Sequence, residues 1–347
     1  MNFSSDNAAG VCAPVMTALA EANRGRAMAY GADPWTEKAE CLLKDLFETD
    51  LAMFPVATGT AANALALSQV TPPWGQVFCH RHAHIEEDEA GAPELFSGGA
   101  KLALLDGPDA RFDAETLAAA LAGAGFGVEH HPQPAVVSLT QLSERGAAYR
   151  IEEIAAICEV AHRHSLLVHM DGARFANALV GLNASAADMT WRAGIDILSF
   201  GATKNGAMAA EAVLFFQPAR AEDFRFRRKR GGHLFSKMRF LSAQLVGYLE
   251  NDAWLANARH ANTMAGRLAE GLGALPGASL AHPVDGNELF IRLPETVVAA
   301  LEEAGGLFHR WEAGPSPTVR LVTAFDSTEA EVDRFVELAR AAAAGGG

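Results

Sequence analysis

The chain has 347 residues, of which half are hydrophobic and a fifth charged, so it can bury a sizeable core in one large domain or two. Its formal net charge is −14, which argues against nucleic acid or an anionic membrane as a partner. The N-terminus lacks the basic and apolar regions of a signal peptide, and no apolar run is long enough to span a bilayer. We therefore expect a soluble, cytoplasmic protein.

The cysteines point to the same compartment. Cys12, Cys41, Cys79 and Cys158 are scattered, with no C-x-x-C pair and no histidine at ligand spacing. In a chain of this length that pattern is typical of reduced, structural thiols, and it predicts no metal site.

Helical and strand patterns alternate along the first two thirds of the chain. Asp33 before Pro34 marks a clean helix start, and short apolar runs predict buried strands. Strands that alternate with helices are typical of a mostly parallel, doubly wound α/β sheet. The expected helices cover residues 14–23, 33–48, 61–69, 113–122 and 151–164, and the expected strands residues 51–57, 76–79, 101–105, 135–139, 165–168, 194–198 and 212–216.

The regular alternation of predicted strands and helices ends after residue 216. A long helical pattern from Lys237 to Leu272 precedes a shorter α/β region, which predicts a smaller C-terminal domain. We place the large domain at residues 21–250 and the small domain at residues 251–347. The elements expected after the long helix are strands near 289–291, 306–308 and 319–322 and helices at 296–303 and 328–343.

Two strand ends carry the residues on which the functional prediction depends. One apolar run leads to Asp171-Gly172-Ala173-Arg174, and the next leads to Thr203-Lys204-Asn205. Open α/β sheets bind ligands in the crevice at the carboxyl ends of their strands. A carboxylate and a lysine there suit pyridoxal phosphate (PLP), because the lysine can form the Schiff base and the aspartate can keep the pyridine nitrogen protonated. Each residue alone is more simply explained by a structural role, but together they favour the cofactor.

A phosphate site is predicted where Thr58-Gly59-Thr60 joins a strand to a helix. The first amides of a helix are unpaired and lie at the positive end of its dipole, which favours a phosphate. Gly59 lets the backbone approach closely, and Thr60 adds a hydroxyl donor. Alone, this sequence is also a common capping loop, but beside Lys204 we interpret it as phosphate-binding.

These motifs resemble those of the low-specificity L-threonine aldolases, PLP enzymes of the aspartate aminotransferase-like fold (fold type I). The likeness covers nearly the whole chain and is strongest to the bacterial branch that includes L-phenylserine aldolase. It implies an aldolase that cleaves L-threonine, L-allo-threonine or L-phenylserine to glycine and an aldehyde, with an arm of residues 1–20 packed near the small domain. The resemblance rests on Ser4-Ser5-Asp6-Asn7, Tyr30-Gly31-Ala32-Asp33, Asn63, Met170–Phe175, Thr203–Gly206 and Ser236–Ala243.

The resemblance assigns roles to the residues of the predicted cofactor site. It implies that Lys204 carries the cofactor, that Asp171 pairs with its ring nitrogen, and that Gly59 and Thr60 hold its phosphate. It implies that His84 stacks on the ring and assists proton transfer, which an imidazole can do because it titrates near neutral pH.

Ser5, Arg174 and Arg320 are implied to converge on the substrate α-carboxylate. Arg320 interrupts an apolar strand and therefore needs an anionic partner, and a planar guanidinium suits a carboxylate. A salt bridge within the small domain is the alternative for Arg320. A contact that holds Asp171 is the alternative for Arg174.

One departure from the family pattern concerns the second active-site histidine that many threonine aldolases carry. After residue 139 this chain reads Thr140-Gln141-Leu142-Ser143-Glu144. We therefore expect Gln141 or a neighbour at that position. A neutral amide can hydrogen-bond a β-hydroxyl but cannot be its general base at neutral pH, which argues against a two-histidine mechanism here.

The basic run from Arg225 to Arg230 stands out in an acidic chain, and by itself it indicates a solvated helix face. In related enzymes this region lies at the subunit interface. The resemblance therefore implies a homodimer or homotetramer with shared active sites, in which Arg230 or Lys237 reaches the phosphate bound by a neighbour.

Two alternatives remain open. A β-eliminating lyase on the same fold would use nearly the same residues. A non-enzymatic PLP-binding protein would need an appended DNA-binding segment or would lack the lysine, and the sequence shows neither feature.

Overall fold

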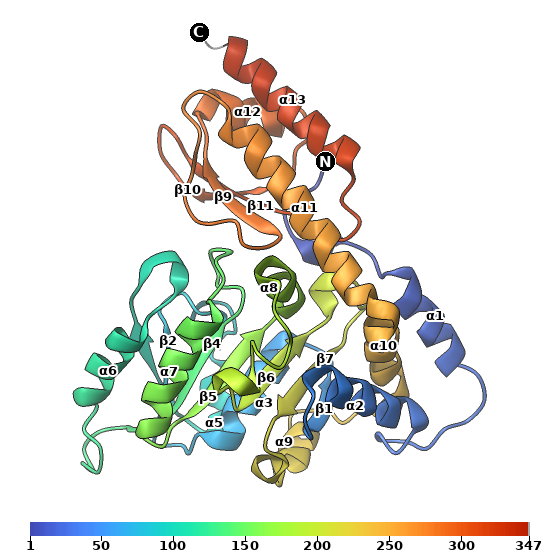
Figure 1. Ribbon diagram of the computed structural model, residues 1–347, viewed down its shortest axis with the longest axis vertical. Coiled ribbons are helices and arrows are strands. Elements are labelled where there is room, and N and C mark those ends of the chain that lie inside the picture. The colour runs from blue at the N-terminus through green and yellow to red at the C-terminus, as the bar shows by residue number, and fades with distance from the viewer. Residues whose placement is uncertain (346–347) are drawn as a thin grey trace.

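A seven-stranded sheet forms the centre of the large domain (Figure 1). In the computed structural model, which describes residues 1–345, its strand order is β1-β7-β6-β5-β4-β2-β3. Neighbouring strands are parallel except that β7 runs antiparallel to β1 and β6, so the expected mostly parallel sheet is confirmed. The strands are β1 (Ala52–Val56), β2 (Gly75–His80), β3 (Lys101–Leu105), β4 (Gln133–Thr140), β5 (Leu167–Gly172), β6 (Ile197–Gly201) and β7 (Glu211–Phe215).

Helices cover both faces of this sheet, because its central strands are apolar on both sides (Figure 1). Successive residues of β7 show the alternation: Leu214 joins the core beneath one layer of helices, while Val213 and Phe215 pack with α3 and α9 on the other face. The helices of this domain are α1 (Ala13–Ala22), α2 (Pro34–Phe47), α3 (Gly59–Val70), α4 (His84–Glu87), α5 (Ala92–Ser97), α6 (Ala114–Ala122), α7 (Ile151–Arg163), α8 (Phe175–Leu182), α9 (Phe224–Arg230) and α10 (Arg239–Leu249).

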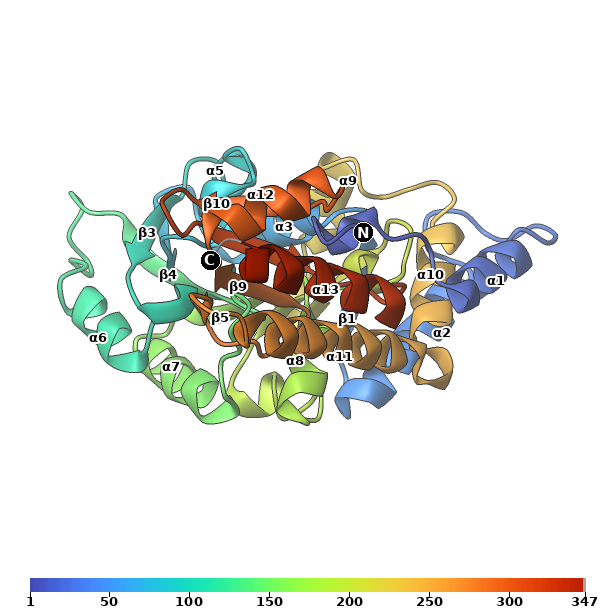
Figure 2. The same ribbon diagram turned by 90° about the horizontal axis from the view of Figure 1, so that it is seen from above.

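The small domain is an antiparallel sheet in the order β10-β11-β9-β8, with three helices packed beside one another (Figure 2). Its core is separate from that of the large domain and is built from all three helices and strands β9 and β11. The elements are α11 (Ala253–Gly273), β8 (Ser279–Leu280), β9 (Glu288–Arg292), α12 (Glu295–Glu303), β10 (His309–Glu312), β11 (Thr318–Val322) and α13 (Glu329–Gly345). The last two residues of the predicted domain, 346 and 347, lie outside the described residues.

Three sequence-based expectations need correction. The single helix predicted from residue 237 to 272 is broken between α10 and α11, where Asn251 and Asp252 both adopt φ of +55°. Short polar side chains tolerate this left-handed conformation, and the break falls at the expected domain boundary. The strand expected at 306–308 instead forms at 309–312, and Leu307 only bridges to Asn2.

The third correction concerns the N-terminal arm, which divides between the domains. Phe3 is buried in the small-domain core, with its ring 5.2 Å from that of Phe335. In contrast, α1 packs against α10 of the large domain, where Ala18 and Ala22 meet Ala243. Across residues 1–345, no helix is both long and apolar enough to cross a membrane.

Candidate active site

A cavity of about 380 Å³ lies at the carboxyl ends of β5 and β6, beside the N-terminus of α3. The structure brings five predicted site residues together on its wall: Lys204, Asp171, His84, Gly59 and Thr60. The cavity therefore lies in the crevice that the order of the strands predicts. Its other lining residues are Asn7, Ala57, Thr58, Ala62, Ala173, Ser199, Gly201, Thr203, Ala209 and Glu211.

Lys204 stands in a short 3-10 turn directly after β6. The Asn205 side chain fixes this turn by donating hydrogen bonds to the Tyr248 hydroxyl and the Trp254 carbonyl, each at 2.8 Å. Within residues 1–345 the Lys204 amine has no hydrogen-bond or ion-pair partner, and it faces the cavity. A half-buried primary amine without a partner is free to attack a carbonyl carbon.

Asp171 lies near the end of β5 and is only 5% exposed. Its Oδ2 accepts a hydrogen bond from Asn63 Nδ2 at 2.8 Å, and its Oδ1 accepts one from the backbone N–H of Ala173 at 2.9 Å. These neutral donors fix the orientation of the carboxylate without a cation. The alternative role for Arg174, holding Asp171, is not seen, because Arg174 bonds to Asp6 instead.

These residues fit PLP. Lys204 offers a free amine and Asp171 a fixed buried carboxylate. At the N-terminus of α3 the Thr58 hydroxyl caps Ala61 at 3.2 Å, which leaves the first helical amides for a phosphate. A Cβ built on Gly59 would meet no atom within 4 Å, so the backbone of this loop is open to a ligand.

Glu211 is a cavity residue that the sequence analysis missed. Burial raises its pKa to about 7, against the opposing effect of hydrogen bonds from Thr203 and Ala202. Its carboxylate accepts the Ala202 N–H at 2.8 Å, just before the lysine turn. No periodic pattern singles out Glu211, which sits at the start of β7 like any polar strand end.

His84 opens α4, and it is held by residues that the sequence analysis did not place in the site. Its Nδ1 lies 2.8 Å from Glu89 Oε1, and its backbone N–H donates to Glu144 at 2.9 Å. Asn63 Nδ2 also donates to Glu89 Oε1 at 2.8 Å. Asn63 therefore connects the carboxylate beneath the histidine to Asp171.

The two predicted substrate arginines are both paired with buried carboxylates. Arg174 donates to Asp6 through Nε at 2.8 Å and Nη2 at 3.1 Å, and its Nη2 lies 3.5 Å from Glu288. Arg320 donates to the same Glu288 at 2.9 Å. Ser5 accepts a hydrogen bond from the backbone of the following turn, next to Asp6. These groups adjoin each other, but they do not line the cavity itself.

Gln141 does not face the cavity. Its side chain is fully buried, its Nε2 donates to the Tyr149 carbonyl at 3.0 Å, and its Oε1 accepts the Tyr149 N–H at 2.9 Å. Because both halves of the amide hold the backbone of this loop, the expected hydrogen bond to a substrate hydroxyl is not available. The residue after β4 that approaches His84 is Glu144, whose pKa burial raises to about 7.

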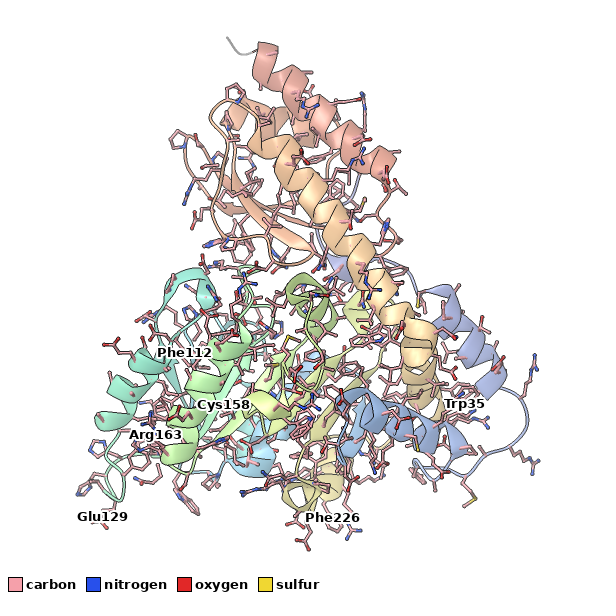
Figure 3. The ribbon with its side chains drawn as sticks, viewed as in Figure 1. Trp35, Phe112, Glu129, Cys158, Arg163 and Phe226 are labelled. Carbon is pink, nitrogen blue, oxygen red and sulfur yellow. The ribbon has the colours of Figure 1, made fainter. Side chains whose placement is uncertain are left out.

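Arg230 and Lys237 are exposed and lie outside the cavity. Arg230 borders a different groove, of about 730 Å³, between α3, α5 and α9. On the same helix Phe226 is 60% exposed and projects from the lower edge of the large domain (Figure 3). Contact of either cation with a phosphate bound by a neighbouring subunit stays a prediction.

Comparison with known proteins agrees with the geometry. The beta-eliminating lyase family matches residues 2–296. A low-specificity L-threonine aldolase of Pseudomonas aeruginosa is 44% identical over 97% of this chain and 96% of its own length. A structure of Leishmania major threonine aldolase superposes with a TM-score of 0.93 at 29% identity, over 99% of both chains. Sphingomonas wittichii serine palmitoyltransferase shares the fold alone, with a TM-score of 0.73 at 14% identity, over 99% of this chain and 87% of its own.

The two domains, the lysine turn and the aspartate at the end of β5 are those of a fold type I PLP-dependent enzyme. Within that class, the chain belongs to the beta-eliminating lyase family and to its low-specificity L-threonine aldolases.

Proposed function

We propose that this protein cleaves L-threonine, L-allo-threonine and L-phenylserine to glycine and the corresponding aldehyde, with PLP as cofactor. The observation that carries the proposal is the single cavity that joins Lys204, Asp171 and the phosphate loop. The identity of 44% to an aldolase over nearly the whole chain supports the reaction type.

Each cavity residue has a task in this reaction. Lys204 would hold the cofactor covalently, Asp171 would accept a hydrogen bond from its ring nitrogen, and Gly59 and Thr60 would bind its phosphate. PLP, when bound, supplies the electron sink that makes Cα–Cβ cleavage possible. His84, which lines the cavity, or an ordered water would accept the proton of the β-hydroxyl.

The substrate carboxylate is expected at Arg174 and Arg320, with Ser5 as a further donor. Asp6 and Glu288 neutralise these arginines in the structure without substrate. When substrate binds, its carboxylate would therefore replace a protein carboxylate at a guanidinium, instead of binding to an unpaired arginine. Because a displaced buried carboxylate would lose its cation, this exchange would cost part of the binding free energy of the substrate.

Product analysis tests the reaction. Incubation of the holoenzyme with L-threonine should yield glycine and acetaldehyde in equal amounts, and L-phenylserine should yield benzaldehyde. A β-eliminating lyase would instead release 2-oxobutanoate and ammonia from threonine. Binding of PLP without turnover of any of these substrates would support the non-enzymatic alternative.

The enzyme is further proposed to be a homodimer or homotetramer whose subunits share active sites through Arg230 or Lys237. Both cations are exposed on a chain of net charge −14: Arg230 ends the basic helix α9, and Lys237 follows it in the chain. One of the variants Arg230→Ala and Lys237→Ala should bind PLP more weakly, because a phosphate contact is lost.

Subunit mixing tests the shared site. A mixture of Lys204→Ala subunits with subunits that lack the borrowed cation should recover activity, since a hybrid contains one complete site. Arg225→Ala, on the same helix, is the control that should leave PLP affinity unchanged. Normal PLP affinity in both the Arg230 and Lys237 variants would exclude the shared site.

A further inference from the structure

Two histidines near the start of α4 make the same contact in different surroundings. His82 Nδ1 lies 2.8 Å from Glu87, and His84 Nδ1 lies 2.8 Å from Glu89, at the same spacing of five residues. The Glu87 side chain is 45% exposed, whereas that of Glu89 is 0% exposed. The two histidine side chains are almost equally exposed, at 37% and 38%, so the pairs differ in the burial of the carboxylate. A hydrogen bond to a charged group is stronger where water is excluded, so we expect Glu89 to fix its histidine more firmly than Glu87 does.

The buried Glu89 carboxylate has a fixed orientation. Its Oε1 accepts from both His84 Nδ1 and Asn63 Nδ2 at 2.8 Å, and Asn63 is itself fixed on Asp171. The other oxygen, Oε2, is buried without a partner among residues 1–345. All donors therefore converge on one oxygen, and the carboxylate cannot turn without losing them.

His84 is held at its backbone by Glu144 and at its imidazole by Glu89. Glu144 accepts the backbone N–H of His84 at 2.9 Å, while Glu89 occupies Nδ1. Since His84 lines the cavity and its Nε2 makes no hydrogen bond within residues 1–345, Nε2 is the ring nitrogen left for the substrate.

We propose that Glu89 is a positioning residue that fixes the tautomer of His84, with the proton on Nδ1 and the lone pair of Nε2 facing the substrate β-hydroxyl. The proposal rests on the aldol cleavage proposed above. In that step the hydroxyl proton moves to Nε2, and the O–H electron pair becomes the second C–O bond of the aldehyde. The Cα–Cβ pair leaves with the carbon that becomes glycine, which later takes up a proton at Cα.

The charges around His84 define a pH dependence. The hydrogen bond to Glu89 raises the pKa of His84, burial opposes it, Asp171 raises it and Lys204 lowers it. Burial in turn raises the pKa of Glu89, against the hydrogen bonds from His84 and Asn63. An imidazole accepts a proton only when neutral, so kcat/KM should rise as the pH passes upward through the His84 pKa. Loss of the Glu89 charge should lower this pKa and move the rise to lower pH.

Nuclear magnetic resonance of histidine labelled with ¹⁵N and ¹³C tests the tautomer directly, in the holoenzyme and after removal of PLP. His84→Asn identifies the resonances of His84. Above its pKa, the wild-type ring should show the Nδ1–H tautomer, and Glu89→Gln should lower the pKa. An Nε2–H tautomer in the wild type would overturn the proposal without recourse to any Glu89 variant.

Kinetics with L-threonine separate positioning from a merely structural role. Glu89→Gln should lower kcat roughly tenfold or more and displace the acidic limb of kcat/KM, while Glu87→Gln, the matched exposed pair, should change neither. The proposal would be contradicted if Glu89→Gln lowered kcat while the pKa of His84 and the acidic limb of the kcat/KM profile both stayed unchanged. The resonance data do not depend on the reaction, so failure of the aldol assignment would be recognised separately from failure at Glu89.

Discussion

Replacing Lys204 with alanine should remove aldolase activity and the visible absorbance of the holoenzyme, with a fall in kcat of roughly three powers of ten or more. The reason is that Lys204 supplies the free amine in the cavity, and its turn is held by Asn205 rather than by the lysine itself. The variant should therefore still fold in the absence of PLP, with a cooperative thermal transition. Absorbance spectra, product assays and thermal unfolding together check this expectation.

Two comparisons make the Lys204 result specific. Lys101→Ala, at an exposed residue of the edge strand β3, should retain both colour and activity. Borohydride reduction of the wild-type holoenzyme, followed by peptide mapping, should place the cofactor on Lys204. A label on another lysine would refute the assignment even if Lys204→Ala were inactive.

The parts of the site that were predictable are those that depend on the ends of strands. Asp171 lies at the end of β5, Lys204 follows the neighbouring parallel strand β6, and Gly59 opens a helix after a third strand. The order of the sheet brings such ends to one edge, so local patterns are sufficient to place them together. The same reasoning predicted the mostly parallel sheet and most element bounds.

The parts that were not predictable depend on partners distant in the sequence. Asn63 meets Asp171 across 108 residues, and Arg174 meets Asp6 across 168. A sequence shows that an arginine in the core needs an anion, but not whether substrate or protein supplies it. Glu89 was hidden in a short acidic run that resembles a solvated surface, because no local pattern separates the buried Glu89 from the exposed Glu87.

The error at Gln141 has a related cause. The position of Gln141 after β4 predicts a side chain that faces the crevice. In the structure, the following loop turns back, and the backbone N–H and C=O of Tyr149 both hydrogen-bond to the Gln141 amide. Burial of the loop backbone requires partners for its N–H and C=O groups. That requirement outweighs the position of Gln141 at the strand end, and Glu144 lies nearer to the site instead.

Arg174→Met should cause the largest loss of stability among the site variants, about 3–5 kcal/mol in the apparent free energy of unfolding. Arg174 joins the domains, because it contacts Asp6 of the N-terminal segment and Glu288 of the small domain. Its side chain is 10% exposed and those of its partners at most 1%, so the substitution leaves the buried Asp6 carboxylate without its cation and leaves Glu288 with Arg320 alone. Adding Asp6→Ala to Arg174→Met should recover part of the lost stability, because it removes the buried carboxylate that lost its cation.

Arg310→Met is the matched control, since Arg310 also binds two carboxylates, Glu295 and Glu302, but on the surface with 39% of its side chain exposed. Its loss should be no more than about 1 kcal/mol. Urea unfolding of both variants at one protein concentration measures the difference. Equal losses for the buried and exposed arginines would show that the buried network does not hold the domains together.

The deficit of Arg174→Met should also depend on pH. Burial alone would raise the pKa of Asp6, but Arg174 and Lys204 outweigh it and hold the pKa below its ordinary value. In the wild type Asp6 therefore contributes stability that is present above its unfolded pKa and lost as the pH falls through its folded pKa. Without Arg174, only Lys204 and the hydrogen bond from Asn287 oppose burial, so the pKa of Asp6 should rise and the folded state should take up a proton at higher pH than in the wild type. The loss of stability should therefore shrink as the pH is lowered from 7 toward the ordinary pKa of an aspartate, about 4. A deficit that stays constant over this range would show that Asp6 remains paired without Arg174.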